Sequence, residues 1–292
     1  MTFIVNFIGA GNLGKTIGRL ILKHPKVKVG AICNRSFEST SEAISFIGDG
    51  KYCPSIKELP PADMTWITTP DDMIENIAKE LATNGSIKSE NIIVHCSGSL
   101  SSEVLKPLQE FGCFVASIHP MRSFANPTIS VEEFAGTYCA MEGDKEALAS
   151  LEPILKSMGA KTYQIDKNKK SLYHAAGVFA SNYLVTLAQQ ALLCLNQAGV
   201  EHEIAMKIIT NLMKGTVLNL EKTLSPGESL TGPIQRGDLS TIKNHLASFS
   251  SPQQKEVYEK LGVATLDLTS HSTEVKNAIS AELSTDKIRY DS

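Results

Sequence analysis

A glycine-rich run near the start of the chain satisfies two phosphate-binding patterns at once. Residues 9–16 read Gly-Ala-Gly-Asn-Leu-Gly-Lys-Thr. Gly9, Gly11 and Gly14 have the spacing of a dinucleotide-binding loop, whereas Gly9 with Gly14-Lys15-Thr16 has that of the P-loop of nucleotide hydrolases and kinases. Both patterns bring an anion to the start of a helix, where free backbone N–H groups attract it. The run therefore predicts a phosphate site and leaves hydride transfer and phosphoryl transfer as alternative chemistries.

The end of the second expected strand favours the dinucleotide alternative. Asn34-Arg35-Ser36 stands there, 25 residues after Gly9. An acidic residue at this place binds the ribose 2′-hydroxyl of NAD, whereas an Arg suits the 2′-phosphate of NADP. Arg35 can pair with that phosphate, and Asn34 and Ser36 can donate hydrogen bonds to it. The segment predicts NADP, unless Arg35 is only a solvated turn residue.

The P-loop alternative also needs an apolar strand that ends in Asp or Glu and holds magnesium. Neither candidate strand meets this requirement, since residues 64–68 are followed by Thr-Pro and residues 92–94 by His-Cys-Ser. Asp71 and Asp72 lie beyond the proline and are better suited to capping the next helix. A phosphotransferase is therefore the less favoured alternative, and Lys15 is expected to be an exposed residue of its helix.

Two further segments are placed to contact a bound cofactor. Thr69-Pro70 suits a loop whose backbone comes close to a cofactor, although Thr-Pro before Asp is also a common helix entry. Ser97-Gly98-Ser99 follows the next strand, and ligands of open α/β sheets bind at the carboxyl ends of strands. The same residues would equally serve as a capping loop for a helix from Ser101. The expected cofactor contacts in these segments and in the glycine loop are Asn12, Leu13, Thr69, Pro70, Ser97 and Gly98.

The elements that must position these residues alternate between strands and helices over the first part of the chain. Several of the strands are continuously apolar, as parallel strands buried on both faces are. Amphipathic helical patterns lie between them. This alternation predicts a doubly wound α/β sheet of the Rossmann type. The expected strands span residues 3–8, 27–33, 64–68, 92–95, 114–118, 138–141 and 161–165, and the expected helices span residues 13–22, 72–82, 101–111 and 145–158.

After residue 165 the pattern changes. A polar segment at residues 166–170 precedes helical periodicity with almost no strand signal. We therefore predict an α/β protein with two domains, a dinucleotide-binding domain over residues 1–165 and an all-α domain over residues 166–292. The expected helices of the second domain span residues 172–198, with Gly199 ending the first, and residues 202–224, 240–247, 252–261 and 273–283.

Composition excludes several other classes of protein. The formal net charge of −3 and the absence of basic blocks argue against a nucleic-acid or membrane surface. The six cysteines are scattered without metal-binding or redox spacing, which predicts reduced, mostly buried thiols and no metal site. We see no stretch long enough for a signal sequence or a membrane span. The sequence therefore predicts a soluble, cytoplasmic protein.

Beyond the glycine loop, short motifs follow one another along nearly the whole chain. In addition to the segments given above, they are His95-Cys96-Ser97-Gly98, Ser117-Ile118-His119-Pro120-Met121, Tyr173-His174-Ala175-Ala176 with Ser181-Asn182, and Thr231-Gly232-Pro233 with Arg236-Gly237-Asp238. Together they resemble the Rossmann-like oxidoreductases whose C-terminal helical domain is of unknown function. Those proteins are similar in architecture to pyrroline-5-carboxylate reductase, ketopantoate reductase, prephenate dehydrogenase and 6-phosphogluconate dehydrogenase. The resemblance implies a nicotinamide cofactor, usually NADP, a site between the domains and a homodimer formed by the helical domain, but no substrate.

Hydride transfer to a carbonyl or imine needs a proton donor near the acceptor heteroatom. His119 is expected at a strand end on the carboxyl edge of the sheet, and His-Pro-Met resembles the segment that carries the active-site histidine of prephenate dehydrogenases. The following residues, Arg122-Ser123-Phe124, depart from that family, so prephenate itself is not expected. Arg122 is a candidate clamp for a substrate carboxylate. The alternative is that His119 only binds backbone at a strand end.

The long helix after residue 170 supplies further candidates. Lys170, His174 and Ser181 have the spacing of one polar stripe, with Asn182 at its edge, and related dehydrogenases place Lys and Asn on the corresponding helix. We expect His174 and Asn182 to be catalytic and Ser181 to contact substrate, as Arg236 does from the later loop. The alternatives are a core role for His174 and a solvated hinge position for Lys170.

The sequence therefore predicts an NADP-dependent oxidoreductase acting on a small carbonyl, imine or hydroxy compound, whose identity and reaction direction stay open. Because no residue is uniquely catalytic, a second hypothesis is a non-catalytic NADP-binding sensor or scaffold. A P-loop phosphotransferase is the third. The expected partners are a small-molecule substrate and a second copy of the chain, without nucleic acid or membrane.

Overall fold

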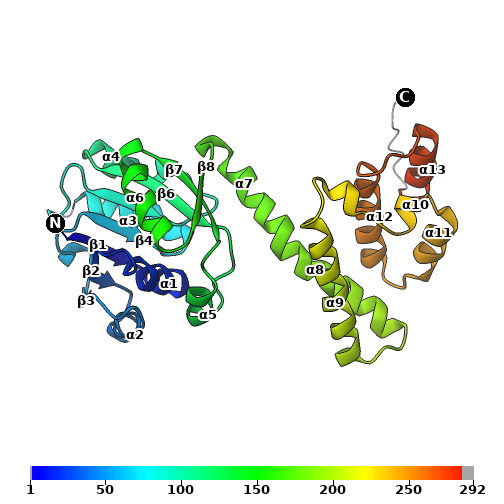
Figure 1. Ribbon diagram of the computed structural model, residues 1–292, viewed down its shortest axis with the longest axis horizontal. Coiled ribbons are helices and arrows are strands. Elements are labelled where there is room, and N and C mark those ends of the chain that lie inside the picture. Colours follow the sequence, from blue (N-terminus) through cyan, green and yellow to red (C-terminus); the bar gives the residue numbers. More distant parts are fainter. Residues whose placement is uncertain (1, 84, 285–292) are drawn as a thin grey trace. The chain divides into compact units, whose positions relative to one another are not determined.

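The computed structural model describes residues 2–83 and 85–284. The chain forms two compact units, Met1–Ala180 and Ser181–Ser292. The first holds all the strands of the described chain, and the second is helical (Figure 1). The predicted α/β fold with an all-α C-terminal part is therefore confirmed. The predicted boundary at residue 165 between functional domains stays a prediction.

One eight-stranded sheet forms the centre of the first unit, in the order β3-β2-β1-β4-β5-β6-β7-β8. The strands from β3 to β6 in this order are parallel, whereas β7 is antiparallel to β6 and parallel to β8. The carboxyl ends of the parallel strands therefore meet at one edge. The strands are β1 (Phe3–Ile8), β2 (Val27–Cys33), β3 (Lys51–Tyr52), β4 (Met64–Ile67), β5 (Ile92–His95), β6 (Phe114–Pro120), β7 (Tyr138–Gly143) and β8 (Lys161–Gln164).

Helices cover both faces of this sheet. Successive strand residues point to opposite faces, so Phe7 packs in one apolar cluster and Ile8 in the other. The first cluster takes the apolar faces of α1 (Asn12–Ile21), α2 (Phe37–Ile47) and α6 (Lys145–Ser157). The second takes those of α3 (Asp71–Ala82) and α4 (Lys106–Glu110), and Figure 1 shows α1 and α6 together in front of the sheet.

Several short elements escaped prediction. The sequence analysis missed α2, the two-residue strand β3 and the helix α5 (Pro127–Glu132), which packs against α1. The expected helix at residues 101–111 is a 3₁₀ turn, η2 (Ser102–Leu105), followed by α4. The other 3₁₀ turns are η1 (Ile56–Glu58), η3 (Lys167–Lys169) and η5 (Pro226–Ser229).

A long helix begins in the first unit and continues into the second. It comprises α7 (Lys170–Gly177), a π-helical turn, η4 (Val178–Asn182), and α8 (Tyr183–Gln197), and Gly199 follows it with a φ of +83°. The expected helix over residues 172–198 is thus present. Contrary to the sequence analysis, residues 167–197 are long and apolar enough to cross a membrane by length and composition.

The second unit packs its helices in two apolar clusters. One joins α8 to α9 (His202–Leu220) through Leu192, Ala205 and Ile209. The other joins the helices that follow α10 through Ile242, Leu266 and Ile279. The remaining helices are α10 (Pro233–Arg236), α11 (Leu239–Ser248), α12 (Pro252–Leu266) and α13 (Thr273–Leu283).

Candidate functional site

The glycine loop connects β1 to α1 in a conformation that requires glycine at its first position. Gly9 has a φ of +84°, and a Cβ atom there would overlap the Cγ2 atom of Thr69. The N–H of Gly9 donates to the carbonyl of Cys33 (2.9 Å), and Thr68 Oγ1 donates to the carbonyl of Gly9 (2.7 Å). The carboxyl ends of β1, β2 and β4 therefore hold the turn from three sides.

Gly11, in contrast to the crowded Gly9, borders open space. No described protein atom beyond its chain neighbours lies within 4 Å of a Cβ built on Gly11. Gly11 caps α1, no described side chain bonds to this helix start, and the first turn has no acidic residue. The leading N–H groups of a helix have no intrahelical acceptor and attract anions. The loop thus offers open space at Gly11, in front of a helix N-terminus that no described side chain caps.

Only one of the three residues after β2 has a free side chain. The Asn34 amide accepts a hydrogen bond from the N–H of Ala10 (2.6 Å) and donates to the carbonyl of Ser39 (2.9 Å). Ser36 caps α2, where its hydroxyl accepts from the N–H of Ser39 (3.2 Å). Arg35 is exposed and has no hydrogen bond or ion pair with any described residue. Asn34 therefore braces the glycine loop, and Arg35 is the residue free to bind a ligand.

The residues that bear on the P-loop alternative have other partners. Lys15 pairs with Glu42 at 3.5 Å and is four-fifths buried rather than exposed as expected. Asp71 was expected to cap a helix, but Pro70 occupies the cap position of α3. The Asp71 carboxylate instead accepts hydrogen bonds from the hydroxyls of Ser97 (2.7 Å) and Ser99 (2.8 Å).

The loops after β4 and β5 meet next to the glycine loop. Thr69 Oγ1 is buried without a hydrogen-bond partner among the described residues, so this hydroxyl is available to a ligand. Ser97, in contrast, is fully engaged, since its hydroxyl also accepts the N–H groups of Ser99 (3.1 Å) and Leu100 (2.9 Å). Ser97 shapes its loop, and the neighbouring Gly98 is the residue that approaches the histidines.

Gly98 brings two predicted catalytic histidines together. A Cβ built on Gly98 would lie 2.6 Å from Cδ2 of His174 and 2.8 Å from Nε2 of His119. The rings of His119 and His174 have centroids 6.0 Å apart and cross at 67°. Any side chain at position 98 would push these rings apart. The structure therefore joins His119 of β6, His174 of α7 and Gly98 at the carboxyl edge of the sheet.

His119 is a neutral imidazole with one ring nitrogen engaged. Its Nδ1 lies 3.0 Å from the Tyr173 hydroxyl, and its Nε2 has no hydrogen bond to a described residue. Burial, followed by the nearby His174 and Lys170, lowers the pKa of His119 to about 4, against a smaller opposing effect of Asp71. Tyr173 escaped the sequence analysis as a site residue, although it stands in the quoted motif directly before His174.

A buried ion pair fixes the start of α7 beside these residues. Lys170 Nζ lies 3.0 Å from Oε1 of Glu142 and donates to the Ser117 hydroxyl. The Glu142 carboxylate also accepts from the N–H (2.8 Å) and the hydroxyl (2.7 Å) of Ser102. The expected solvated hinge position of Lys170 is therefore wrong, because its neighbours on β6 and β7 enclose it.

His95 is hydrogen-bonded to the backbone at both ends of the loop that contains Ser97. Its Nδ1 accepts the N–H of Ser97 (3.1 Å), so its Nε2 carries the proton and donates to the carbonyl of Ser101 (3.2 Å). Burial, followed by the charge of Lys170, lowers the pKa of His95 to about 3. His95 is therefore a neutral structural histidine with both ring nitrogens engaged.

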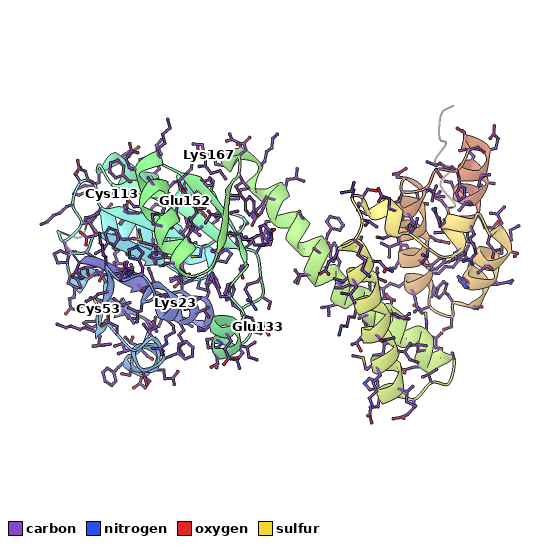
Figure 2. The ribbon with its side chains drawn as sticks, in the orientation of Figure 1. Lys23, Cys53, Cys113, Glu133, Glu152 and Lys167 are labelled. Atoms are coloured by element: carbon purple, nitrogen blue, oxygen red, sulfur yellow. The ribbon has the colours of Figure 1, made fainter. Side chains whose placement is uncertain are left out.

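The remaining predicted site residues are Arg122, Ser181, Asn182 and Arg236. Arg122 donates to the carbonyl of Glu133 and pairs with its carboxylate at 3.0 Å, while its buried Nε has no partner among the described residues. Glu133 ends α5 and is labelled in Figure 2. Ser181 and Asn182 lie exposed in the π turn, and Arg236 is exposed at the end of α10. Because these three belong to the second unit, they stay predicted site residues.

The described cysteines and acidic residues form no further centre. Five of the six cysteines are buried, and all are free thiols. Burial raises the pKa of Cys33 to about 12, which makes this thiol unreactive at neutral pH. Within residues 2–83 and 85–284, no group of three or more His, Cys, Asp or Glu side chains could hold a metal ion.

Solved structures share this architecture. Protein TM1727 from Thermotoga maritima is 28% identical, with a TM-score of 0.71 over 90% of this chain and 97% of that one. A candidate NADP oxidoreductase from Bacteroides fragilis is 21% identical, with a TM-score of 0.73 over 91% and 98%. Pyrroline carboxylate reductase from Plasmodium falciparum, with NADP bound, is 14% identical, with a TM-score of 0.58 over 97% and 98%.

Two family models match the sequence, while no curated protein matches it significantly. The Rossmann-like domain model covers residues 2–120, which include the glycine loop and His119. The model of DUF2520, a domain of unknown function, covers residues 137–265, which include Glu142, Lys170 and His174. The chain thus combines a Rossmann-like domain with a C-terminal domain of the DUF2520 family.

Proposed function

We propose that the protein is an NADP-dependent oxidoreductase that transfers hydride between the nicotinamide and a small carbonyl, imine or hydroxy compound. The observation that carries this proposal is the open space over Gly11 at the uncapped start of α1. A pyrophosphate needs both a glycine that lets it approach the backbone and free N–H groups to bind it.

The residues around this space fit NADP. Arg35, exposed and without a described partner, would bind the 2′-phosphate, and no carboxylate at the end of β2 would repel it. The buried, unpartnered hydroxyl of Thr69 would contact the cofactor. The bound NADP of the Plasmodium falciparum reductase, which shares the fold, supports the same assignment. When bound, the nicotinamide supplies or accepts a hydride ion.

His119 is the proposed proton donor or acceptor for the substrate heteroatom. The Nε2 atom of His119 has no hydrogen bond to a described residue. The residue beside this nitrogen, Gly98, has no side chain to occupy the space next to it. His174 and Asn182 are proposed to bind or orient the substrate, as are Ser181, Arg122 and Arg236. The proposal for Arg122 requires that a substrate carboxylate competes with Glu133 for its guanidinium.

Nicotinamide fluorescence during titration with NADPH tests the cofactor half of the proposal. We expect saturable binding, weaker binding of NADH, and NADPH binding that is about tenfold or more weaker in Gly11→Ala. Absence of binding at high micromolar NADPH would overturn it. Magnesium-dependent ATP binding that is lost in Lys15→Ala would instead establish the phosphotransferase alternative.

A screen of small aldehydes, ketones, imines and alcohols tests the catalytic half. We expect NADPH oxidation or NADP reduction with at least one of them, and in His119→Ala a large loss of turnover without loss of NADPH affinity. Tight NADPH binding with no turnover across the screen would favour the sensor or scaffold hypothesis.

We further propose a cytoplasmic homodimer formed by the second unit. Leu212 of α9 is 66% exposed and Ile204 is 50% exposed, and exposed apolar surface of this extent is typical of protein interfaces. The buried charge of Lys170 at the start of the apolar helix argues for contact with protein rather than with lipid. Light scattering on the purified protein tests this. A monodisperse monomer would contradict the dimer, and sedimentation with membranes would contradict the cytoplasmic location.

A further inference from the structure

Two tyrosines lie behind His119 on the side away from Gly98. We propose that Tyr173 and Tyr163 form a proton relay, which holds His119 in the tautomer protonated on Nε2 and replaces the proton that Nε2 gives to the substrate. The proposal rests on the proposed function and assigns two further residues to it. It concerns only residues of the first unit, on β6, β8 and α7.

The hydrogen bonds run in one direction. The Tyr163 hydroxyl donates to the Tyr173 oxygen at 3.3 Å, and the Tyr173 oxygen lies 3.0 Å from His119 Nδ1. A phenol has a single proton to donate. No other acceptor for the Tyr173 proton occurs among the described residues, so this proton points to Nδ1. Nδ1 is then the acceptor, and the proton of the neutral imidazole resides on Nε2.

The charges around His119 keep the imidazole neutral before the reaction. His174 and Lys170 of α7 face it and disfavour a second proton, and Asp71 of α3 is too weak an opposing influence to restore it. Desolvation, the largest of these effects, acts in the same direction as the two neighbours. His119 therefore has one ring proton to give at neutral pH, and this proton is on the nitrogen beside Gly98.

A neutral imidazole is a poor acid on its own. Loss of the Nε2 proton without a gain at Nδ1 would leave an imidazolate anion, which is strongly basic and costly in a site that is mostly removed from water. Delivery of a proton to Nδ1 as Nε2 loses one avoids this anion. The Tyr173 hydroxyl is the group in contact with Nδ1, so it is the group placed to deliver that proton.

The reductive step balances as follows. A bound, reduced nicotinamide would supply the hydride for the new C–H bond, and the electron pair of the substrate C=O or C=N bond would move to the heteroatom. That atom takes the Nε2 proton of His119, Nδ1 takes the Tyr173 proton, and Tyr173 takes the Tyr163 proton. Tyr163, which is half-buried, recovers a proton from solvent. The oxidative direction reverses each transfer.

Tyr138 supplies a matched control. Its ring lies 6.3 Å from that of Tyr163 and it is 56% exposed, but its hydroxyl has no hydrogen bond to the relay. Loss of the Tyr138 hydroxyl therefore changes a neighbouring tyrosine of the same sheet without breaking the chain of hydroxyls. Phe replaces Tyr in each variant, because it keeps the ring and removes only the group that bears the proton.

The test is the ¹⁵N NMR spectrum of the His119 ring in the ligand-free protein at pH 7, together with NADPH affinity. We expect the Nε2–H tautomer in the wild type and in Tyr138→Phe. In Tyr173→Phe we expect its excess over the other tautomer to fall by about five- to tenfold, which corresponds to one lost hydrogen bond. With the cyclic imine pyrroline as probe, kcat should fall in Tyr173→Phe and less in Tyr163→Phe, at unchanged NADPH affinity.

The outcomes separate this proposal from the one it rests on. A wild-type His119 protonated on Nδ1, or a tautomer ratio unchanged in Tyr173→Phe, overturns the relay while NADPH binding is intact. Failure of the wild type to bind NADPH overturns the proposed function instead. Should Tyr173→Phe unfold, Tyr163→Phe carries the test, because it removes the outer hydroxyl and is expected to weaken the same tautomer preference by a smaller factor.

Discussion

Lys170 Nζ lies 3.0 Å from Oε1 of Glu142, and the two residues are only 2% and 4% exposed. Ser102 and Ser117 complete the hydrogen bonding of the pair. The contact joins the first turn of α7 to β7, and α7 carries Tyr173 and His174 one turn further on. The ion pair therefore sets the position of the helix that presents these two side chains to His119.

We expect Lys170→Met to lower the free energy of unfolding by about 3–5 kcal/mol, because it leaves the Glu142 carboxylate buried without its cation. The double variant Lys170→Met/Glu142→Leu should recover part of this loss. Lys167→Met is the matched control, since Lys167 (labelled in Figure 2) pairs with Glu103 at 2.8 Å on the exposed surface. It should leave the stability nearly unchanged, because solvent screens an exposed ion pair. Urea denaturation measures all three, and equal losses for both lysines would contradict this account.

Gly9 and Gly11 should respond differently to alanine. Gly9→Ala should destabilise the first unit by about 1–3 kcal/mol, because of the φ of +84° and the overlap with Thr69. Gly11→Ala should fold normally and bind NADPH about tenfold or more weakly, since its Cβ enters only the open space. Thermal denaturation and NADPH titration of both variants check this. A Gly11→Ala protein with wild-type affinity would place the pyrophosphate elsewhere.

Arg35 should determine the preference for NADP. Its loss in Arg35→Ala should weaken NADPH about 10- to 100-fold, the value of one charge-assisted contact. NADH, which lacks the 2′-phosphate, should bind as before. Titration of both cofactors gives the ratio. Lys15→Ala is the control, because Lys15 is held by Glu42 and should leave the ratio unchanged. An equal loss for both cofactors would mean that Arg35 does not contact the 2′-phosphate.

Acid should destabilise the first unit through its buried neutral histidines. The pKa values of His119 and His95 are lowered to about 4 and about 3, below an ordinary value of about 6.5. In this interval the unfolded chain binds more protons, so stability is complete above about pH 6.5 and falls as the pH drops towards these values. The slope is about 1.4 kcal/mol per pH unit for each histidine.

Melting temperatures between pH 7 and pH 4 measure this effect. His95→Gln should reduce the acid-induced fall in melting temperature relative to its own value at pH 7. His202→Gln, at an exposed position of α9, should leave the fall unchanged. A wild-type profile that stays flat down to pH 4.5 would show that the two histidines are accessible and protonated in the folded protein.

Periodicity located the long elements because they bury regular apolar faces. The strands from β1 to β8 were found except β3, whose two residues are too few for a period. Helix α2 reads Phe-Glu-Ser-Thr-Ser-Glu-Ala and lacks a strong apolar stripe, so it was missed. The antiparallel direction of β7 could not be predicted from the sequence pattern either. Side chains alternate along a strand in the same way in parallel and antiparallel pairing.

Sequence reasoning could name residues that a single segment places, but it could not find contacts between two distant segments. His119, His174 and Gly98 each follow from a strand end, a motif or a loop, and they lie together. The engagement of Asn34 with Ala10, and that of Lys170 with Glu142, are contacts between distant segments. Residue type and spacing give no account of such pairing. Tyr163 belongs to the same class, because only the contact of its hydroxyl with that of Tyr173 brings it near His119.

The antiparallel register of β6 and β7 bears on the order in which the chain folds. Ser117 stands directly opposite Glu142 and His119 opposite Ala140, so a slip of one residue would turn Glu142 to the other face of the sheet. Lys170 is 28 residues from Glu142 and 53 from Ser117 along the chain, and closing such loops is entropically costly. The ion pair is therefore expected to form late in folding, after the transition state. Its loss should then raise the unfolding rate more than it lowers the folding rate.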